Sequence, residues 1–139
     1  MPVHLIKLAV GARAVADIRR WQAARARDNP PLRHPTRNYP RRAEELLDGG
    51  SIYWVVDGIV SVRQRLAGIA EGTREDGTPC TDLLLRRALV LVVPRPMRPF
   101  QGWRYLEAED APADLPTGGT RANDLPEDLR RDLARLALL

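Results

Sequence analysis

The 139-residue sequence predicts an α+β fold, in which helices flank a mostly antiparallel, partly closed sheet that resembles a β-barrel. Segments rich in Val, Ile and Leu concentrate in the middle of the chain, whereas helical patterns lie at its two ends. Two turn signals that contain Asp-Gly separate the central segments, which is typical of antiparallel hairpins. The length and the 44% hydrophobic content indicate a single domain, residues 1–139.

Residues 1–48 are expected to form a mainly helical, Arg-rich part that begins with one strand. The segment Val3–Val10 alternates well enough to predict that strand. Apolar side chains recur at helical spacing in Ala12–Arg27, and the Asn-Pro-Pro run at residues 29–31 ends this helix.

The rest of this part is predicted to contain a loop and a short helix. Leu32–Tyr39 is polar and contains Pro, so we expect a loop. Pro40–Asp48 has Pro near its start and an apolar face, and Gly49-Gly50 follows, so we expect a short helix that ends there.

Residues 51–106 are expected to be the β-rich core. Ser51–Val56 and Ile59–Leu66 are predicted to pair as a hairpin, because Asp57-Gly58 suits a turn with positive φ at both positions. Further strands are expected at Cys80–Leu85, Ala88–Val93 and Trp103–Leu106.

The last part of the chain is predicted to hold a linker and a helix. Residues 107–123 are acidic at first and then contain Gly-Gly, which is typical of a linker. Residues 124–139 carry a capping-box spacing and a stripe of Leu, which predicts a C-terminal helix.

The expected location is the cytoplasm, without membrane association. No stretch reaches the roughly 20 apolar residues that a membrane helix requires. The N-terminus lacks the basic start and long apolar segment of a secretory signal. The one cysteine, Cys80, allows no internal disulfide, which fits a reducing compartment.

Four stretches carry a resemblance to a known family. They are Val3–Leu8, Arg42–Val55, Val62–Arg65 and the distinctive Arg98–Leu106, which reads Arg-Pro-Phe-Gln-Gly-Trp-Arg-Tyr-Leu. Over nearly its whole length the chain resembles the bacterial family catalogued as domain of unknown function 1489. The resemblance implies a cytoplasmic single-domain protein, and it transfers no activity and no catalytic residues. In element order alone, the chain is also similar to PUA-like barrels and their ASCH and EVE relatives, which often bind RNA or modified bases.

Positive charge is concentrated near the N-terminus. The net charge is +4, but residues 1–70 carry +6 and residues 71–139 carry −2. Residues 19–42 hold eight Arg and one acidic residue. A GC-rich genome accounts for the preference of Arg over Lys, yet it does not account for this clustering. Guanidinium groups bind phosphates bidentately and stack on bases, so the cluster indicates nucleic acid.

Aromatic residues near the basic residues favour the same interpretation. Trp54 and Trp103 could wall a base-sized pocket, because stacking tolerates any base, although a core position suits Trp54 better. The alternative for the Arg residues is a solvated face with ion pairs such as Arg41 with Glu45. The candidate binding residues are Arg19, Arg20, Arg33, His34, Arg37, Tyr39, Arg41, Arg42, Arg63, Arg65, Trp103 and Arg104.

Catalysis, metals and cofactors have little support in the sequence. Neither His4 nor His34 has an obvious local partner for proton transfer. Cys80 lacks the surroundings of a nucleophile and is expected to lie in the core. No Cys/His spacing predicts a zinc site, and no Gly-rich phosphate loop follows a strand. We therefore predict no catalytic residue, no metal and no cofactor.

The sequence thus predicts a small cytoplasmic nucleic-acid-binding module without catalysis, with RNA favoured over DNA. One alternative is an interaction or scaffold domain whose Arg-rich face meets an acidic protein. Another is a small enzyme that acts on a nucleotide or nucleic acid. A continuous basic groove would favour the first, a flat Arg patch with an apolar centre the second, and a concave pocket with a perturbed titratable group the third.

Overall fold

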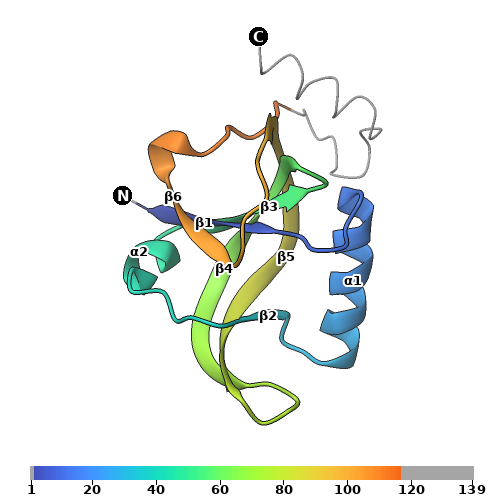
Figure 1. Cartoon of the computed structure of the whole chain (residues 1–139), viewed down its shortest axis with the longest axis vertical. Helices are drawn as coiled ribbons and strands as arrows, with labels where there is room; N and C mark the ends of the chain where they lie inside the picture. Colours follow the sequence, from blue (N-terminus) through green and yellow to red (C-terminus); the bar gives the residue numbers. More distant parts are fainter. Residues whose placement is uncertain (1, 117–139) are drawn as a thin grey trace.

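A computed structural model of the chain describes residues 2–116, and the helix expected at residues 124–139 lies outside them. The described part contains a six-stranded sheet in the order β2-β5-β4-β3-β1-β6 and two α-helices, which confirms the α+β class. Along the chain (Figure 1), the elements are β1 (Val3–Leu8), α1 (Val15–Asp28), β2 (Arg33–Thr36), α2 (Ala43–Leu47), β3 (Ser51–Val56), β4 (Ile59–Thr73), β5 (Pro79–Pro96), β6 (Trp103–Glu107) and a 3-10 turn, η1 (Ala108–Asp110).

The sheet is mixed and open, so the expected closure into a barrel-like sheet is wrong. β1 runs parallel to β3, and every other neighbouring pair is antiparallel. The strand order begins at β2 and ends at β6, and these edges do not pair within the described chain. The sheet also extends beyond residues 51–106, because β1 and β2 from the N-terminal part join it. A parallel pair requires a long crossover, which here carries α1, β2 and α2.

β2 corrects the expectation of a loop at Leu32–Tyr39. Arg33–Thr36 pairs antiparallel with the segment of β5 from Thr81 to Leu84. The segment has no apolar alternation and contains Pro35, which strands tolerate only at an edge. β2 is an edge strand, so the strand follows from its pairing with β5 and not from its own composition.

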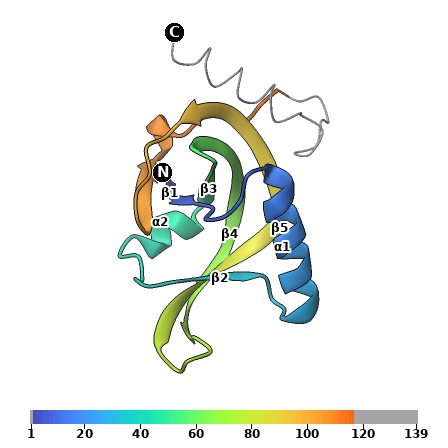
Figure 2. The same cartoon turned by 45° about the vertical axis from the view of Figure 1, so that its right-hand side comes forward.

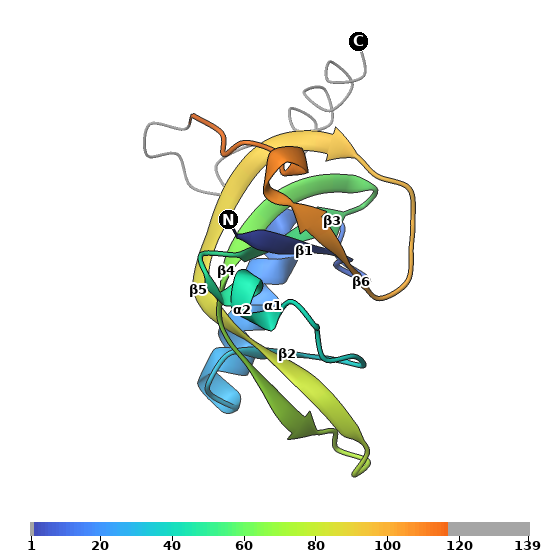
Figure 3. The same cartoon turned by 90° about the vertical axis from the view of Figure 1, so that its left-hand side faces the viewer.

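β4 and β5 form one long bent hairpin. The turn between β3 and β4 has positive φ at Asp57 and Gly58, as predicted. The two strands expected at Cys80–Leu85 and Ala88–Val93 are one strand, β5, with a bulge at Arg86-Arg87 where the register with β4 shifts. Bulges bend a strand and increase its twist. Figure 2 shows β5 arched over β3 and β4, and Figure 3 shows the hairpin extending past the other strands.

Both faces of the sheet are covered, which explains why all six residues of β3 are buried. Side chains alternate along each strand, so Ile52 and Trp54 face α1 and α2, whereas Tyr53 and Val55 face away. We call the first face the helix side. The other face packs against Phe100, from the segment between β5 and β6.

The start of the expected linker packs on the sheet. Asp114 forms an isolated bridge with Val92, and the Leu115 amide donates to the Leu91 carbonyl at 3.0 Å. The Asp114 carboxylate also accepts two hydrogen bonds from Arg63, at 2.7 and 2.8 Å. Residues 117–123 of that linker lie outside the described residues. Neither α-helix of residues 2–116 is long and apolar enough to cross a bilayer.

Candidate functional site

The site begins with a row of three side chains across the sheet. Lys7 of β1 lies directly opposite Trp54 of β3 and directly opposite Trp103 of β6. Residues directly opposite each other on neighbouring strands project from the same face, so the lysine lies between the two indoles on the helix side. Burial lowers the pKa of Lys7, and no carboxylate of residues 2–116 forms an ion pair with it.

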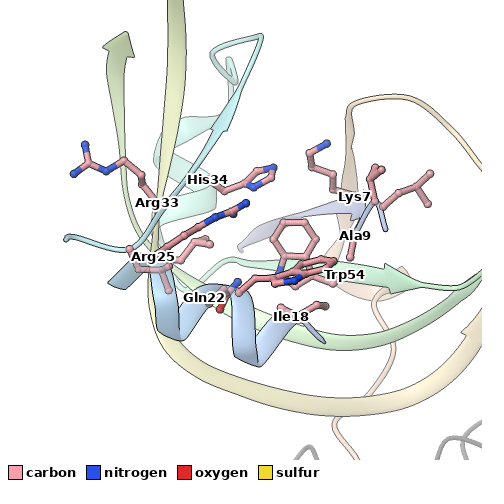
Figure 4. A pocket seen from close by; sticks show the side chains of 13 residues that line it. Lys7, Ala9, Ile18, Gln22, Arg25, Arg33, His34 and Trp54 are labelled. Atoms are coloured by element: carbon pink, nitrogen blue, oxygen red, sulfur yellow. The ribbon is translucent and has the colours of Figure 1, made fainter. Parts of the chain in front are cut away.

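On one side of Lys7 lies a pocket of about 240 Å³, which we call the inner pocket. Its walls come from α1, β1, β2, β3 and β5 (Figure 4). Trp21 and Trp54 provide aromatic walls, and Ile18, Leu32 and Leu85 provide apolar ones. Its polar and charged lining consists of Lys7, Gln22, Arg25, Arg33 and His34.

A hydrogen-bonded pair of glutamines fixes Trp54 in this pocket. Gln64 is fully buried, and its side-chain oxygen accepts from the Trp54 indole N–H at 3.1 Å and from the Gln22 amide at 2.9 Å. Its amide donates to the Gln22 side chain and to the Arg86 carbonyl, both at 2.7 Å. The indole nitrogen of Trp54 is therefore occupied by the protein, and the ring is a buried core residue, as expected, that borders the pocket.

His34 is neutral and has an unsatisfied nitrogen. Its ring contacts Trp54 edge-to-face at a centroid distance of 5.1 Å. Burial lowers the pKa of His34 to about 4, and the positive charges of Lys7, Arg25 and Arg74 contribute. Its Nε2 atom is buried, and no group in the described chain forms a hydrogen bond with it. The surroundings of His34 thus disfavour a further positive charge and favour an anion.

On the other side of Lys7 lies an opening of about 720 Å³ between β2 and β6, which we call the outer groove. These two strands are the opposite edges of the sheet, yet both line the groove. A hydrogen bond of 3.4 Å from the Trp103 indole to the Asn38 carbonyl spans between the edges. Lys7 and His34 line both cavities, so the two adjoin.

The outer groove is basic and aromatic. Its cations are Lys7, Arg37, Arg41 and Arg74, and its aromatic residues besides His34 are Tyr39, Trp103 and Tyr105. None of the described residues that line it is acidic. No Arg of this groove has an ion pair within the part of the chain that the structure covers.

About half of the sequence-predicted site residues meet in these cavities. The outer groove contains His34, Arg37, Tyr39, Arg41 and Trp103, and the inner pocket contains Arg33 and His34. Arg33 is held in place, because its guanidinium donates to the Pro30 and Pro31 carbonyls. The cavities do not contain Arg19, Arg20, Arg42, Arg63, Arg65 or Arg104.

Half of the excluded arginines form ion pairs within the protein. Arg20 pairs with Asp17 of the same helix, and Arg63 pairs with Asp114. Arg42 pairs with Glu45 and Glu107 and lies over the Tyr105 ring.

Arg104, Arg19 and Arg65 are excluded by their positions. Arg104 stacks on the Phe100 ring, because it projects from the face of β6 opposite to Trp103. Arg19 lines a separate hollow between α1 and β5, and Arg65 is exposed on β4.

Several site residues were missed by the sequence interpretation. One had a readable signal, because Lys7 follows Val3 and Leu5 on the buried face of β1, where a charge is unusual. Arg74 follows β4 and Arg25 lies on α1, so only the tertiary structure brings them near His34.

The remaining titratable candidates have structural roles. His4 accepts a hydrogen bond from the Ser51 amide at 3.0 Å, and burial lowers its pKa. Cys80 is buried as expected, and burial raises the pKa of its thiol, which disfavours the nucleophilic thiolate. In residues 2–116, no three His, Cys, Asp or Glu side chains come together in a way that could hold a metal.

Comparison with known proteins identifies a protein family but no individual relative. The model of a family described as "Protein of unknown function (DUF1489)" matches residues 5–139. No curated protein and no solved structure matches the chain. The match covers nearly the whole sequence and confirms the family resemblance, so the chain belongs to the DUF1489 family.

Proposed function

We propose that this protein binds single-stranded nucleic acid, with RNA favoured over DNA, along the outer groove. The observation that carries the proposal is the charge of the groove, which is lined by four cations and by no described acidic residue. Cations without carboxylate partners are available to neutralise phosphates. The groove is concave and adjoins a second cavity, and these features fit a strand better than a flat protein surface.

The aromatic residues of the groove favour unpaired bases. Tyr39 is 49% exposed, and Trp103 is partly exposed and stands edge-to-face with Tyr105 at 5.0 Å. Aromatic rings beside a positively charged groove are typical of sites for single strands, because the faces of paired bases are hidden in the duplex. The preference for RNA continues the sequence-based expectation, as do a cytoplasmic location and a similarity to PUA-like domains.

The enzyme alternative is less well supported than binding. The inner pocket is concave and holds a titratable group with a perturbed pKa, as that alternative requires. However, none of its described lining residues is Asp, Glu, Ser, Thr or Cys. Among these lining residues, His34 therefore has no hydroxyl or thiol to activate and no carboxylate to orient it. The scaffold alternative would need an acidic protein surface shaped to enter the groove.

The test is the salt dependence of RNA binding. A variant with Arg37, Arg41 and Arg74 replaced by Gln is compared with the wild-type chain, using labelled single-stranded and double-stranded RNA. Each lost phosphate contact flattens the plot of log affinity against log salt by roughly 0.7 for a single strand, so we expect a total change of about 2.

A matched variant controls for net charge. Arg13, Arg86 and Arg98 are exposed and line neither cavity, so their replacement by Gln removes the same charge elsewhere. We expect this control to keep most of the wild-type slope. Equal slopes for the two triple variants, or no RNA binding at about 50 mM salt, would reject the proposal and favour a protein partner.

A further inference from the structure

We infer that the inner pocket binds one unpaired nucleobase, and that the phosphate of the same nucleotide lies at the junction of the two cavities, beside Lys7 and His34. This inference rests on the proposed function, because it places one nucleotide of the bound strand in a defined position. It goes further by giving the protein a site that reads a base and not only the backbone.

The size and walls of the inner pocket fit a flat heterocycle. At about 240 Å³ it is smaller than the pockets of about 300–1,000 Å³ that take drug-sized ligands. Trp21 and Trp54 offer two indoles, and the glutamine pair holds the Trp54 ring in one orientation. Because an aromatic side chain can stack on the flat face of any base, a preformed aromatic wall suits a planar nucleobase.

The polar groups of the pocket can meet the edge of a base. The buried Nε2 of His34 has no hydrogen-bond partner in residues 2–116, although buried polar atoms in folded proteins are nearly always bonded. Gln22 uses one amide hydrogen and its oxygen on Gln64, which leaves its second amide hydrogen for a ligand. An apolar ligand would leave both groups unsatisfied, whereas a heterocycle with ring nitrogens and exocyclic groups can bond to them.

The charge at the mouth of the pocket fits a phosphate. Lys7, Arg25 and Arg74 all act electrostatically on His34, and no acidic side chain of the described chain lines either cavity. In Figure 4, Lys7, Arg25 and His34 point toward the same space above Trp54. A phosphate there would be followed by the next phosphates along the outer groove, because Lys7 and His34 belong to both cavities.

The experiment measures the binding of the four ribonucleoside monophosphates to the full chain, with ribose 5-phosphate as the ligand that lacks a base. We expect at least one nucleotide to bind at least tenfold more tightly than ribose 5-phosphate. Trp21→Leu should weaken that binding by about 5-fold to 100-fold, the range for the loss of one stacked base. Nucleotide should also shift the indole N–H resonances of Trp21 and Trp54 more than that of Trp103.

Three further measurements separate folding and charge from recognition. Thermal melts of Trp21→Leu show whether the variant folds, and His34→Gln provides a second variant that keeps a polar group in the pocket. His34→Gln should alter the ranking of the four nucleotides, whereas loss of fold would abolish binding of all four. The triple variant of Arg13, Arg86 and Arg98 should bind nucleotide as the wild-type chain does.

The outcomes for the base pocket and for strand binding are distinct. Equal binding of nucleotides and ribose 5-phosphate, or nucleotide affinities weaker than about 1 mM, would overturn the base pocket. If RNA binding with the expected salt dependence persisted, the proposed function would stand without it. If nucleotides bound in the pocket but RNA did not bind at all, the proposed function would fail and the pocket would be a mononucleotide site.

Discussion

The neutral His34 makes the stability of this protein depend on pH, and the size of the effect follows from its surroundings. In the folded chain its pKa is lowered from 6.5 to about 4, first by burial and then by Lys7, Arg25 and Arg74. As the pH falls, the unfolded chain therefore binds a proton on this ring at a higher pH than the folded chain does. The contribution of the neutral His34 ring to the free energy of unfolding is fully present above about pH 6.5 and is lost as the pH falls toward 4.

The expected loss is large enough to measure. One pKa unit corresponds to about 1.4 kcal/mol, so the full shift is worth about 3 kcal/mol below pH 4. Between pH 7 and pH 5, only part of this difference develops, and we expect about 2 kcal/mol. The effect is a considerable fraction of the roughly 5–15 kcal/mol by which domains are stable.

The assay is urea unfolding at pH 7, 6 and 5 for the wild-type chain and for His34→Gln. The glutamine does not titrate, so the variant should lose about 2 kcal/mol less than the wild-type chain between pH 7 and pH 5. His4, whose pKa is also lowered by burial and by Arg63, is present in both proteins and cancels in the comparison. Equal losses for the two proteins would refute the claim that His34 is held neutral by the fold.

Three other changes test the packing around the site. Gln64→Leu leaves the indole N–H of Trp54 buried without an acceptor and should cost about 1–3 kcal/mol or more in urea unfolding. Gly50→Ala places a Cβ against the backbone carbonyl oxygen of Leu46, so thermal melts should show a loss of at least about 1–3 kcal/mol, whereas an unchanged melting temperature would contradict this packing. Tyr105→Phe removes a hydroxyl that accepts a backbone N–H before α2 at 3.1 Å, and should cost about 0.5–1.5 kcal/mol by the same measurement.

Local signals in the sequence predicted most of the elements. The Asp57-Gly58 turn was predictable because positive φ at both positions is a property of those two residues. The bulge at Arg86-Arg87 was visible only as an interruption between two apparent strands, since the bend of β5 depends on its register with β4. The parallel pairing of β1 with β3 has no local signal, because it depends on how the intervening crossover packs.

The candidate site was predictable in part. The aromatic and basic residues near His34 were recognised from composition, but composition does not distinguish a free arginine from one paired with a distant acid. Arg63 finds Asp114 and Arg42 finds Glu107 through tertiary contacts. Strand alternation alone could have shown that Trp103 and Arg104 do not share a site, because consecutive residues of a strand project from opposite faces of the sheet.

The position of β1 sets the order in which the molecule can be completed. β1 precedes the other described strands along the chain, yet Val3 lies opposite Glu107 on β6. Until that residue has left the ribosome, one backbone edge of β1 stays unpaired, and exposed strand edges recruit other chains. A ribosome that stalls after the β4–β5 hairpin would therefore release a product in which one backbone edge of β1 is unpaired beside apolar side chains. Such a product is prone to aggregate.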